Sequence, residues 1–207
     1  MSRSKQDMSA KLAAENALRA EGYNYICGVD EVGRGPLAGP VVCAAVIMPA
    51  EDIIEGVDDS KKLSAKKREK LDALIREKAI AWAICRIEPQ QIDEMNILQA
   101  TRLCMKNAIE SLKTSPDFVI TDGNMTLDIA FPQRHIIGGD ASCYSIGAAS
   151  ILAKVYRDKI MDEYAADYPW YGFEKNKGYG TAAHIAAIKD RGLCPIHRRS
   201  FTKKWSD

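Results

Sequence analysis

Apolar runs of strand length alternate along the chain with longer segments in which apolar residues recur at helical spacing. The short runs cover residues 23–30, 41–49, 80–88, 117–123 and 134–140, and most of them end at glycine, proline or acidic residues. Runs of this length with such boundaries are typical of buried β-strands. We therefore predict a strand at each of these positions.

The longer segments predict amphipathic helices between the strands. In residues 65–79 four apolar residues recur at helical spacing, and Ser64 directly before them is a favourable N-cap. The helix predicted over 145–164 is unusually small and apolar in its first half, as expected where a helix lies close against a sheet. Further helices are predicted over residues 9–21, 96–112 and 181–192, and Gly192 ends the last one.

This alternation, without an internal repeat, predicts an α/β fold with a mixed β-sheet flanked by helices. A chain of 207 residues that is 46% hydrophobic and 28% charged is typical of one globular domain. We expect this domain to cover residues 1–207, with a helical lead-in over 1–22 and a core over about 24–202. No apolar run reaches the roughly 20 residues of a membrane span, and the N-terminus does not read as a secretory signal. We expect a monomeric, cytoplasmic protein with no membrane partner.

Cysteine and charge patterns narrow the chemistry only partly. The six cysteines include no CxxC pair and mostly lie in apolar runs, which predicts reduced, buried thiols rather than a zinc ribbon. The formal charge is only +1, but eight lysines and arginines fall between residues 175 and 204 against the single acid Asp190. Such a block either contacts phosphates or forms a solvated basic face, and composition leaves both open.

Four acids fall where predicted strands end. Asp30 and Glu31 close the first strand, Asp122 closes the fourth, and Asp140 lies between the fifth strand and the long helix. In open α/β sheets, residues at strand ends converge on one site although they are far apart in sequence. Taken singly, each acid has a simpler explanation as a turn residue, a helix cap or a solvated side chain.

Taken together, the four carboxylates indicate a metal site. Carboxylates packed together raise one another's pKa unless a divalent cation neutralises them, and oxygen ligands without nearby cysteine or histidine favour Mg²⁺ or Mn²⁺. Two such ions about 4 Å apart can activate a water and stabilise the leaving oxygen in phosphodiester hydrolysis. Because side chains alternate along a strand, Asp30 and Glu31 should serve one site only if the strand ends or distorts between them.

The loop after the first strand, GRGPLAG at residues 33–39, has two interpretations. Its glycines serve a tight turn between two strands, or they let backbone groups approach a ligand while Arg34 contacts a phosphate. A sugar 2′-hydroxyl suits such backbone contact, because it both donates and accepts hydrogen bonds, and it distinguishes RNA from DNA. The GxxxxGK[ST] and GxSxG segments of nucleoside triphosphate hydrolysis and acyl transfer are absent.

From about Tyr25 to Phe201 the sequence resembles bacterial ribonuclease HII, the type 2 ribonuclease H family. The matching segments, in chain order, are GVDEVGRGPLAGPVV, DDSKKLS, NILQATRLCM, VITDGN, GAASILAKVYRD, NKGYGT and PIHRRSF. The resemblance implies a ribonuclease H-like fold with Mn²⁺ or Mg²⁺ as cofactor. It also implies an endonuclease that hydrolyses RNA in RNA/DNA hybrids and cuts ribonucleotide-containing duplex DNA on the 5′ side of the ribonucleotide, leaving 5′-phosphate and 3′-hydroxyl ends.

The resemblance assigns the metal site by position. It implies that the catalytic metal ligands are Asp30, Glu31, Asp122 and Asp140. Two neighbours of the fourth acid depart from the family pattern, which often has a lysine two residues before this acid and a serine directly after it. Here these positions are Gly138 and Ala141. Because the acid itself is kept, we expect activity, with altered phosphate contact beside it.

The resemblance also assigns substrate contacts. It implies that the 2′-hydroxyl is read by Gly33, Arg34 and Gly35, and that the substrate-sensing tyrosine is Tyr179. Further candidate phosphate contacts, which a helix cap and surface charge explain about equally well, are Ser60, Lys61 and Lys177.

Three other polar residues are set apart from catalysis. His184 is interpreted as a helix surface residue, and His197 as structural or phosphate-facing. Asp158 lies about five helical turns, roughly 27 Å, beyond Asp140, so we expect an ion pair there rather than metal binding.

Two alternatives to an active ribonuclease HII fit the sequence less well. Ribonuclease HIII shares the acids but carries a sizeable N-terminal substrate-binding domain, for which the roughly two dozen residues before the first strand are too few. A catalytically silent hybrid-binding module would lack one of the acids, and none is missing.

Overall fold

The computed structural model describes residues 8–205 and is built around a five-stranded sheet. The strands are β1 (Ile26–Val32), β2 (Val41–Ile47), β3 (Ala81–Ile87), β4 (Phe118–Asp122) and β5 (Gln133–Ile136). Their spatial order is β3-β2-β1-β4-β5, in which β1, β2 and β3 pair antiparallel and β1, β4 and β5 pair parallel. The predicted mixed sheet is confirmed, and every predicted strand is present.

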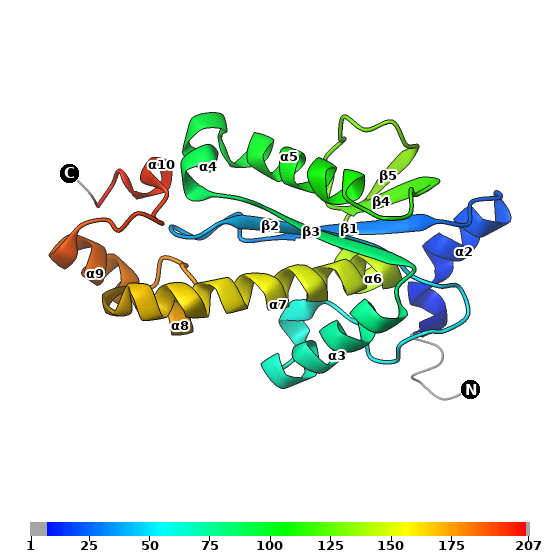
Figure 1. Ribbon diagram of the computed structural model, residues 1–207, viewed down its shortest axis with the longest axis horizontal. Helices are drawn as coiled ribbons and strands as arrows, with labels where there is room; N and C mark the ends of the chain where they lie inside the picture. The colour runs from blue at the N-terminus through cyan, green and yellow to red at the C-terminus, as the bar shows by residue number, and fades with distance from the viewer. Residues whose placement is uncertain (1–7, 206–207) are drawn as a thin grey trace.

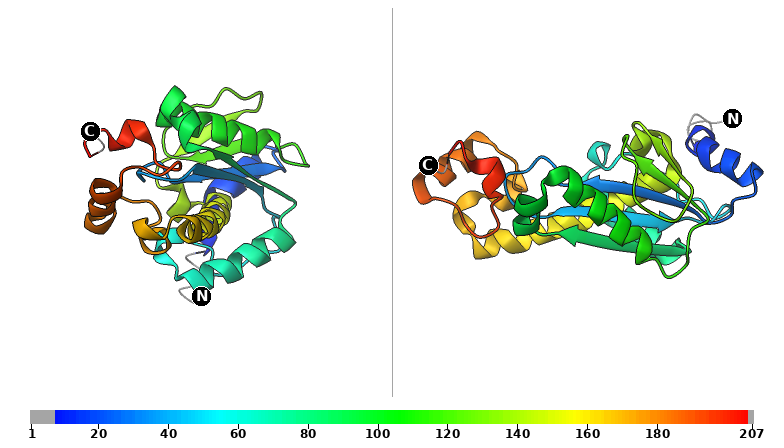
Figure 2. Two further views of the ribbon diagram at one scale, coloured as in Figure 1. Left: turned by 60° about the vertical axis from the view of Figure 1, so that its left-hand side comes forward. Right: turned by 90° about the horizontal axis from the view of Figure 1, so that it is seen from above.

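Helices cover both faces of this sheet (Figure 1, Figure 2). One face is covered by α4 (Pro89–Met95) and α5 (Ile97–Glu110), and the other by α3 (Ala65–Lys78) and the long α7 (Tyr144–Asp167). The remaining elements are α2 (Ala13–Ala20), α6 (Gly139–Ser142), α8 (Phe173–Asn176), α9 (Ala182–Arg191), α10 (Arg199–Thr202) and the 3₁₀ turns Ser60–Lys62 and Pro169–Tyr171. The predicted flanking helices are thus confirmed.

Local chemistry explains where several helices begin and end. The Ser64 side chain accepts a hydrogen bond from the amide of Lys67, so it is the N-cap of α3 that the sequence predicts. The side chain of Asn96 accepts from two amides at the start of α5. Gly192 ends α9 with a φ of +76°, a left-handed value that glycine adopts without strain.

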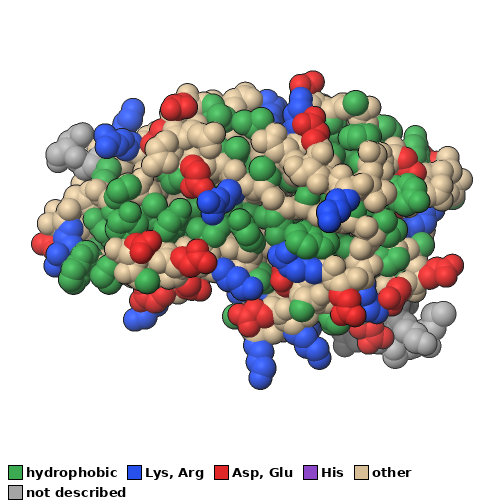
Figure 3. Space-filling model, in the orientation of Figure 1, with side chains coloured by type: hydrophobic (Ala, Val, Ile, Leu, Met, Phe, Trp, Pro, Cys, Tyr) green, Lys and Arg blue, Asp and Glu red, His purple; other side chains and the backbone are tan. Residues whose placement is uncertain are grey.

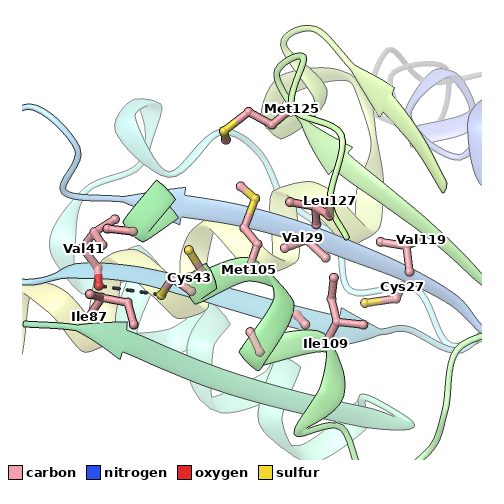
Figure 4. Close-up of a cluster of buried hydrophobic side chains, with 14 of the residues drawn as sticks. Cys27, Val29, Val41, Cys43, Ile87, Met105, Ile109, Val119, Met125 and Leu127 are labelled. Atoms are coloured by element: carbon pink, nitrogen blue, oxygen red, sulfur yellow. Dashed lines mark hydrogen bonds between the residues drawn. The ribbon is translucent and has the colours of Figure 1, made fainter. Parts of the chain in front are cut away.

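Each face of the sheet carries its own hydrophobic cluster, because side chains alternate along every strand. On the α5 face, Cys27 and Val29 of β1 pack with Met105 and Ile109 of α5 (Figure 4). Removing such fully buried side chains costs about 2–5 kcal/mol each. All seven residues of β2 are buried, as expected for a central strand that is covered on both faces.

The cysteines follow the prediction of reduced, buried thiols. All six lie within residues 8–205 and are free, and all except the partly exposed Cys85 are buried. Burial raises the pKa of Cys27 to about 12, so this thiol stays protonated at neutral pH. The cysteines therefore contribute to packing.

Helix α7 approaches β1 more closely than a side chain would permit. A Cβ on Gly28 would lie 2.3 Å from the carbonyl carbon of Ser145 and 2.5 Å from the amide nitrogen of Ile146. Only glycine allows two backbones to come this near. The contact explains the small residues in the first half of α7, and it places α7 beside the acids that follow Gly28.

The N-terminal helix is joined to the start of α7. Glu15 of α2 is 2% exposed. Its carboxylate accepts a hydrogen bond from the Ser145 amide at 2.9 Å and another from the Ser145 hydroxyl at 2.8 Å. Since α7 has no side-chain cap at its N-cap residue, Glu15 satisfies one of its free amides and complements the positive end of the helix dipole. The helix predicted over residues 9–21 is therefore packed onto the rest of the fold.

The surface has mixed charge. In Figure 3, Lys and Arg side chains stand out along the lower edge, over α3, with acidic side chains among them. The basic block between residues 175 and 204 is not one solvated face, because Arg198 is fully buried and Lys177 pairs with Asp162. Within the part of the chain that the structure describes, no helix combines the length and the hydropathy needed to cross a membrane.

Candidate active site

Three of the four predicted acids are gathered by the parallel part of the sheet. The pairing of β1 with β4 ends at Val29 and Thr121, so Asp30 and Asp122 each follow the last paired residue of neighbouring strands. Asp122 accepts a hydrogen bond from the amide of Gly139 at 2.7 Å, which holds the start of α6 and its Asp140 beside the end of β4. Segments far apart in sequence thus bring these three acids into the same region of the fold.

The remaining acid, Glu31, follows Asp30 without the strand break that the sequence reasoning required. The pairing of β1 with β2 is regular through Asp30, opposite Ala44, and Glu31, opposite Cys43, and continues to the end of the strand. The expected distortion is therefore wrong. Instead β4 stops at Asp122, and the charge of Asp122 acts on both acids of β1. The charge of Asp122 at the end of β4 therefore links the two acids of β1 without a break in that strand.

Burial changes the proton affinity of the two acids of β1, Asp30 and Glu31. It raises the pKa of Asp30 well above its ordinary value, and the charges of Glu31 and Asp122 raise it further, against a hydrogen bond from Ser150 that lowers it. Burial also raises the pKa of Glu31, partly offset by the Arg34 guanidinium. A cluster of this kind is stabilised by added positive charge.

Two basic side chains provide such charge in this structure. Arg34 Nη1 lies 3.2 Å from Glu31 Oε1, and Lys61 Nζ lies 3.2 Å from Asp140 Oδ2. The Lys61 side chain is 77% exposed and that of Arg34 is 45% exposed, so both can move away from the acids without disturbing the core.

The donor set fits a hard divalent cation, although it is not in a coordinating arrangement. Among residues 8–205, no group of three His, Cys, Asp or Glu side chains is placed to hold a metal ion. Carboxylate oxygens are nevertheless the ligands that Mg²⁺ and Mn²⁺ prefer, and the negative charges of Glu31 and Asp122 act on Asp30.

The glycine-arginine-glycine loop and Tyr179 lie together. A Cβ on Gly35 would be 3.7 Å from the Cε1 atom of the Tyr179 ring, and this ring is 45% exposed. The amide of Leu37 donates to the carbonyl of Gly178 at 2.8 Å, which ties the two segments to each other. The sequence names these residues separately, and the fold makes them neighbours beside Glu31, which Arg34 contacts.

The three candidate phosphate contacts occupy different environments. Ser60 is 4% exposed, and its hydroxyl shares a hydrogen bond of 2.9 Å with Ser150. Ser60 therefore faces the interior, next to a residue that lowers the pKa of Asp30. Lys61 lies at the acids, whereas the Lys177 ammonium group pairs with Asp162.

Open space lies beside Gly138, one of the two positions near Asp140 that depart from the family pattern. Gly138 has a φ of +68°, and a Cβ there would meet nothing within 4 Å. A cavity of about 540 Å³ adjoins this corner, and its lining includes Ala141, Lys11, Lys62 and Lys67. Three lysines and Asp58 therefore line the cavity next to Ala141.

The residues set apart from catalysis are structural. Asp158 pairs with Lys154 at 2.6 Å and with Arg68 at 3.6 Å, which confirms the expected ion pair. His184 is fully buried, so its expected surface position is wrong, and its Nε2 lies 3.0 Å from Nε2 of His197. Burial and the proximity of His184 lower the pKa of His197 to about 4.

Sequence reasoning missed two fully buried arginines, Arg157 and Arg198, which contact the backbone of the glycine-rich loop. A signal existed for Arg157. It lies four residues after Ala153 and four before Met161, both fully buried, so helical periodicity places it on the inward row of α7. For Arg198 the segment PIHRRSF contains no periodic pattern that distinguishes the buried arginine from its exposed neighbour.

Comparison with solved structures identifies the class. The crystal structure of ribonuclease H2 from Pyrococcus horikoshii matches with a TM-score of 0.74 and 27% identity, covering 87% of this chain and 96% of that one. The structure of Bst-RNase HIII in complex with Mn²⁺ shares the fold, with a TM-score of 0.65 and 20% identity over 81% of this chain and 63% of that one. This fold, with acids at the ends of its strands, defines a ribonuclease H.

Sequence comparison identifies the family within this class. The family model described as ribonuclease HII matches residues 27–204. The ribonuclease HII of Caldicellulosiruptor bescii is 56% identical over 189 residues, which is 91% of this chain and 92% of the relative. The chain belongs to the ribonuclease HII family. It is an enzyme that hydrolyses RNA in RNA/DNA hybrids.

Proposed function

We propose that Asp30, Glu31, Asp122 and Asp140 hold two Mg²⁺ or Mn²⁺ ions, and that the enzyme cuts duplex DNA on the 5′ side of a single ribonucleotide. The products are a 5′-phosphate and a 3′-hydroxyl. One observation carries this proposal: acids from β1, β4 and α6 meet beside an exposed Arg34–Gly35 segment of the glycine-rich loop. Phosphodiester cleavage and recognition of the adjacent sugar then occur at one place.

The chain's own residues orient this site. When bound, the two ions would supply an activated water and stabilise the leaving oxygen. The amide of Glu31 donates to the carboxylate of Asp30, and the amide of Gly139 donates to that of Asp122. Arg34 releases Glu31, Lys61 releases Asp140, and both side chains then bind substrate phosphates. Guanidinium and ammonium groups both bind phosphates well.

The loop and Tyr179 select the sugar. The backbone of Gly33, Arg34 and Gly35 contacts the 2′-hydroxyl, and Tyr179 lies against the deoxyribose beyond the junction. The exposed Tyr179 lies next to Gly35, which supports this assignment. Two sugars that follow each other in the substrate strand would contact two groups that are neighbours in the protein.

We also propose that the enzyme acts as a monomer in the bacterial cytoplasm. The acids, the loop and Tyr179 all come from one chain, so the site needs no second copy. The cytoplasm is where a bacterium keeps its duplex DNA. The silent hybrid-binding alternative has no support, since none of the four acids is replaced.

Cleavage of a labelled duplex tests the proposal. The substrate is a DNA duplex with one embedded ribonucleotide, incubated with Mg²⁺ or Mn²⁺, and an all-DNA duplex of the same sequence is the control. We expect a single nick 5′ of the ribonucleotide in the first duplex and none in the second. Binding of the first duplex without cleavage in either metal would show that this site does not perform the reaction.

A further inference from the structure

Arg157 and Arg198 are 0% exposed, although each carries a full positive charge. Within residues 8–205 the hydrogen bonds of their side chains all end on backbone carbonyl oxygens. Burial lowers the pKa of Arg157 to about 10 and that of Arg198 to about 9, the latter also because Arg157 is near. Two like charges in a protein interior are costly, so a specific structural task must offset them.

Arg157 reaches from α7 into the glycine-rich loop. Its Nε donates to the carbonyl of Pro40 at 3.0 Å and its Nη2 to that of Ala38 at 3.2 Å. Its Nη1 donates to the carbonyl of Lys177 at 2.9 Å, two residues before Tyr179. One guanidinium thus joins the loop to the segment that carries the tyrosine.

Arg198 holds the other side of the same loop. Its Nη1 donates to the carbonyl of Arg34 at 2.9 Å, its Nη2 to that of Gly33, and both Nε and Nη2 to that of Gly39. Its own amide donates to the carbonyl of Leu37 at 2.8 Å. The two arginines together bind the carbonyls of residues 33, 34, 37, 38, 39 and 40.

The carbonyl groups that point toward the two arginines determine the direction of the amide groups that follow them in the loop. In a trans peptide the C=O and the following N–H point in opposite directions, and no peptide bond among the described residues is cis. The carbonyls of Gly33 and Arg34 point at Arg198, so the amides of Arg34 and Gly35 point away from it. Both residues are exposed, and neither amide has an acceptor among residues 8–205, whereas the amide of Leu37 bonds to Gly178.

The loop also lies directly on Arg157. A Cβ on Gly33 would be 2.3 Å from Arg157 Nε, so the backbone at Gly33 is in contact with the guanidinium. A lysine cannot make these contacts, because its single ammonium lacks the planar fork that reaches several carbonyls at once.

We propose that Arg157 and Arg198 are positioning residues that present the amides of Arg34 and Gly35 to the substrate, and that they set the preference for a ribonucleotide over a deoxyribonucleotide. This inference rests on the proposed function of the loop. The two arginines act on the substrate through the loop backbone, while metal binding belongs to the four acids.

The test separates sugar recognition from duplex binding. For the full-length Arg198→Lys and Arg157→Lys enzymes with Mg²⁺, kcat/KM is measured on the single-ribonucleotide duplex. The all-DNA duplex serves as a competitive inhibitor whose Ki reports duplex binding alone. Misplacing the loop should lower kcat/KM about 100-fold. Because the charge is kept, Ki should change by less than about threefold.

A matched control is Arg76→Lys on α3. Arg76 binds Asp72 through two hydrogen bonds and stacks on Trp82, so it loses comparable contacts in another part of the molecule. Its kcat/KM and Ki should both stay near those of the unmodified enzyme. The melting temperature of each variant shows whether it is folded.

A milder variant covers the case in which the lysine enzymes do not fold. Phe201→Leu removes the ring that lies 5.2 Å from the Arg198 guanidinium and leaves both arginines in place. It should lower kcat/KM about threefold to tenfold, with Ki unchanged. A folded variant that keeps kcat/KM, or loses kcat/KM and duplex binding in equal proportion, would overturn the inference. If the unmodified enzyme showed no preference for the ribonucleotide duplex, the proposed function itself would fail instead.

Discussion

Replacing Gly35 by alanine should separate folding from substrate recognition in the glycine-rich loop. The new Cβ would touch only the Tyr179 ring, at the ordinary contact distance of 3.7 Å, and the φ of Gly35 lies outside the left-handed region. Alanine therefore fits the folded backbone without strain. It also has fewer conformations in the unfolded chain, which favours the folded state.

We expect Gly35→Ala to raise the stability of the enzyme and to lower its activity. A glycine-to-alanine change at a compatible position adds about 0.4–1 kcal/mol of stability, which corresponds in a chain of this size to a melting temperature unchanged or raised by roughly 1–4 °C. The same methyl group stands on the exposed side of the loop, where a sugar hydroxyl must approach the backbone. A displacement of about 1 Å there lowers kcat/KM about 100-fold.

Two measurements on one sample test this reasoning. Calorimetric unfolding gives the melting temperature, and the nicking assay gives kcat/KM, with Ki of the all-DNA duplex as the measure of binding. Gly33→Ala is the control, because its Cβ would lie 2.3 Å from Arg157 Nε at a φ of +92°, so it should lose both stability and activity. A Gly35→Ala enzyme that melts lower, cuts normally, or loses cleavage and duplex binding equally would refute the role of this loop.

Three further outcomes are expected. Asp122→Asn should abolish nicking and leave the melting temperature nearly unchanged, because an asparagine oxygen can still accept from the amide of Gly139; retained turnover would remove Asp122 from the site. Gly28→Ala should lose about 1–3 kcal/mol, or roughly 2–12 °C in melting temperature, since its Cβ would meet the Ser145 backbone at 2.3 Å; a normal melting temperature would contradict this close contact. Burial keeps His197 neutral and lowers its pKa to about 4, against an ordinary value of 6.5. The neutral imidazole therefore contributes fully to the free energy of unfolding above pH 6.5, and this contribution is lost as the pH falls towards 4. At pH 5 the loss is about 2 kcal/mol. Denaturant unfolding of His197→Gln should show a shallower loss between pH 7 and 5, and equal slopes in both proteins would count against it.

Periodic and local signals in the sequence were sufficient for the architecture. Ser64 precedes an apolar pattern with helical period and caps α3, and the Asp-Gly step at residue 122 marks the end of β4. Both depend on a few neighbouring residues, which is the range over which such signals act. The mixed sheet followed from the succession of these elements, the ends of the predicted strands located the four acids, and the resemblance to ribonuclease HII assigned them as metal ligands.

Features that depend on two distant segments could not be predicted in the same way. The sequence suggested a distorted strand between Asp30 and Glu31, because the position at which β4 stops beside β1 is not encoded near either acid. The burial of His184 against His197 and of Arg198 under the loop depends on how the C-terminal segments fold back. The catalytic and substrate roles of the individual residues stay predictions until the variants are measured.

The Glu15 carboxylate has a practical consequence for altering the N-terminus. Its hydrogen bonds to Ser145 act on the same turn of α7 that touches Gly28, and this helix then carries Ser150 to Asp30. Deleting the first 22 residues would remove the acceptor for that turn and uncover the apolar contact of Leu18 with Ile26. Such a shortened enzyme would retain every catalytic residue and still lose activity, and supplying the missing helix as a separate peptide would be a direct way to restore it.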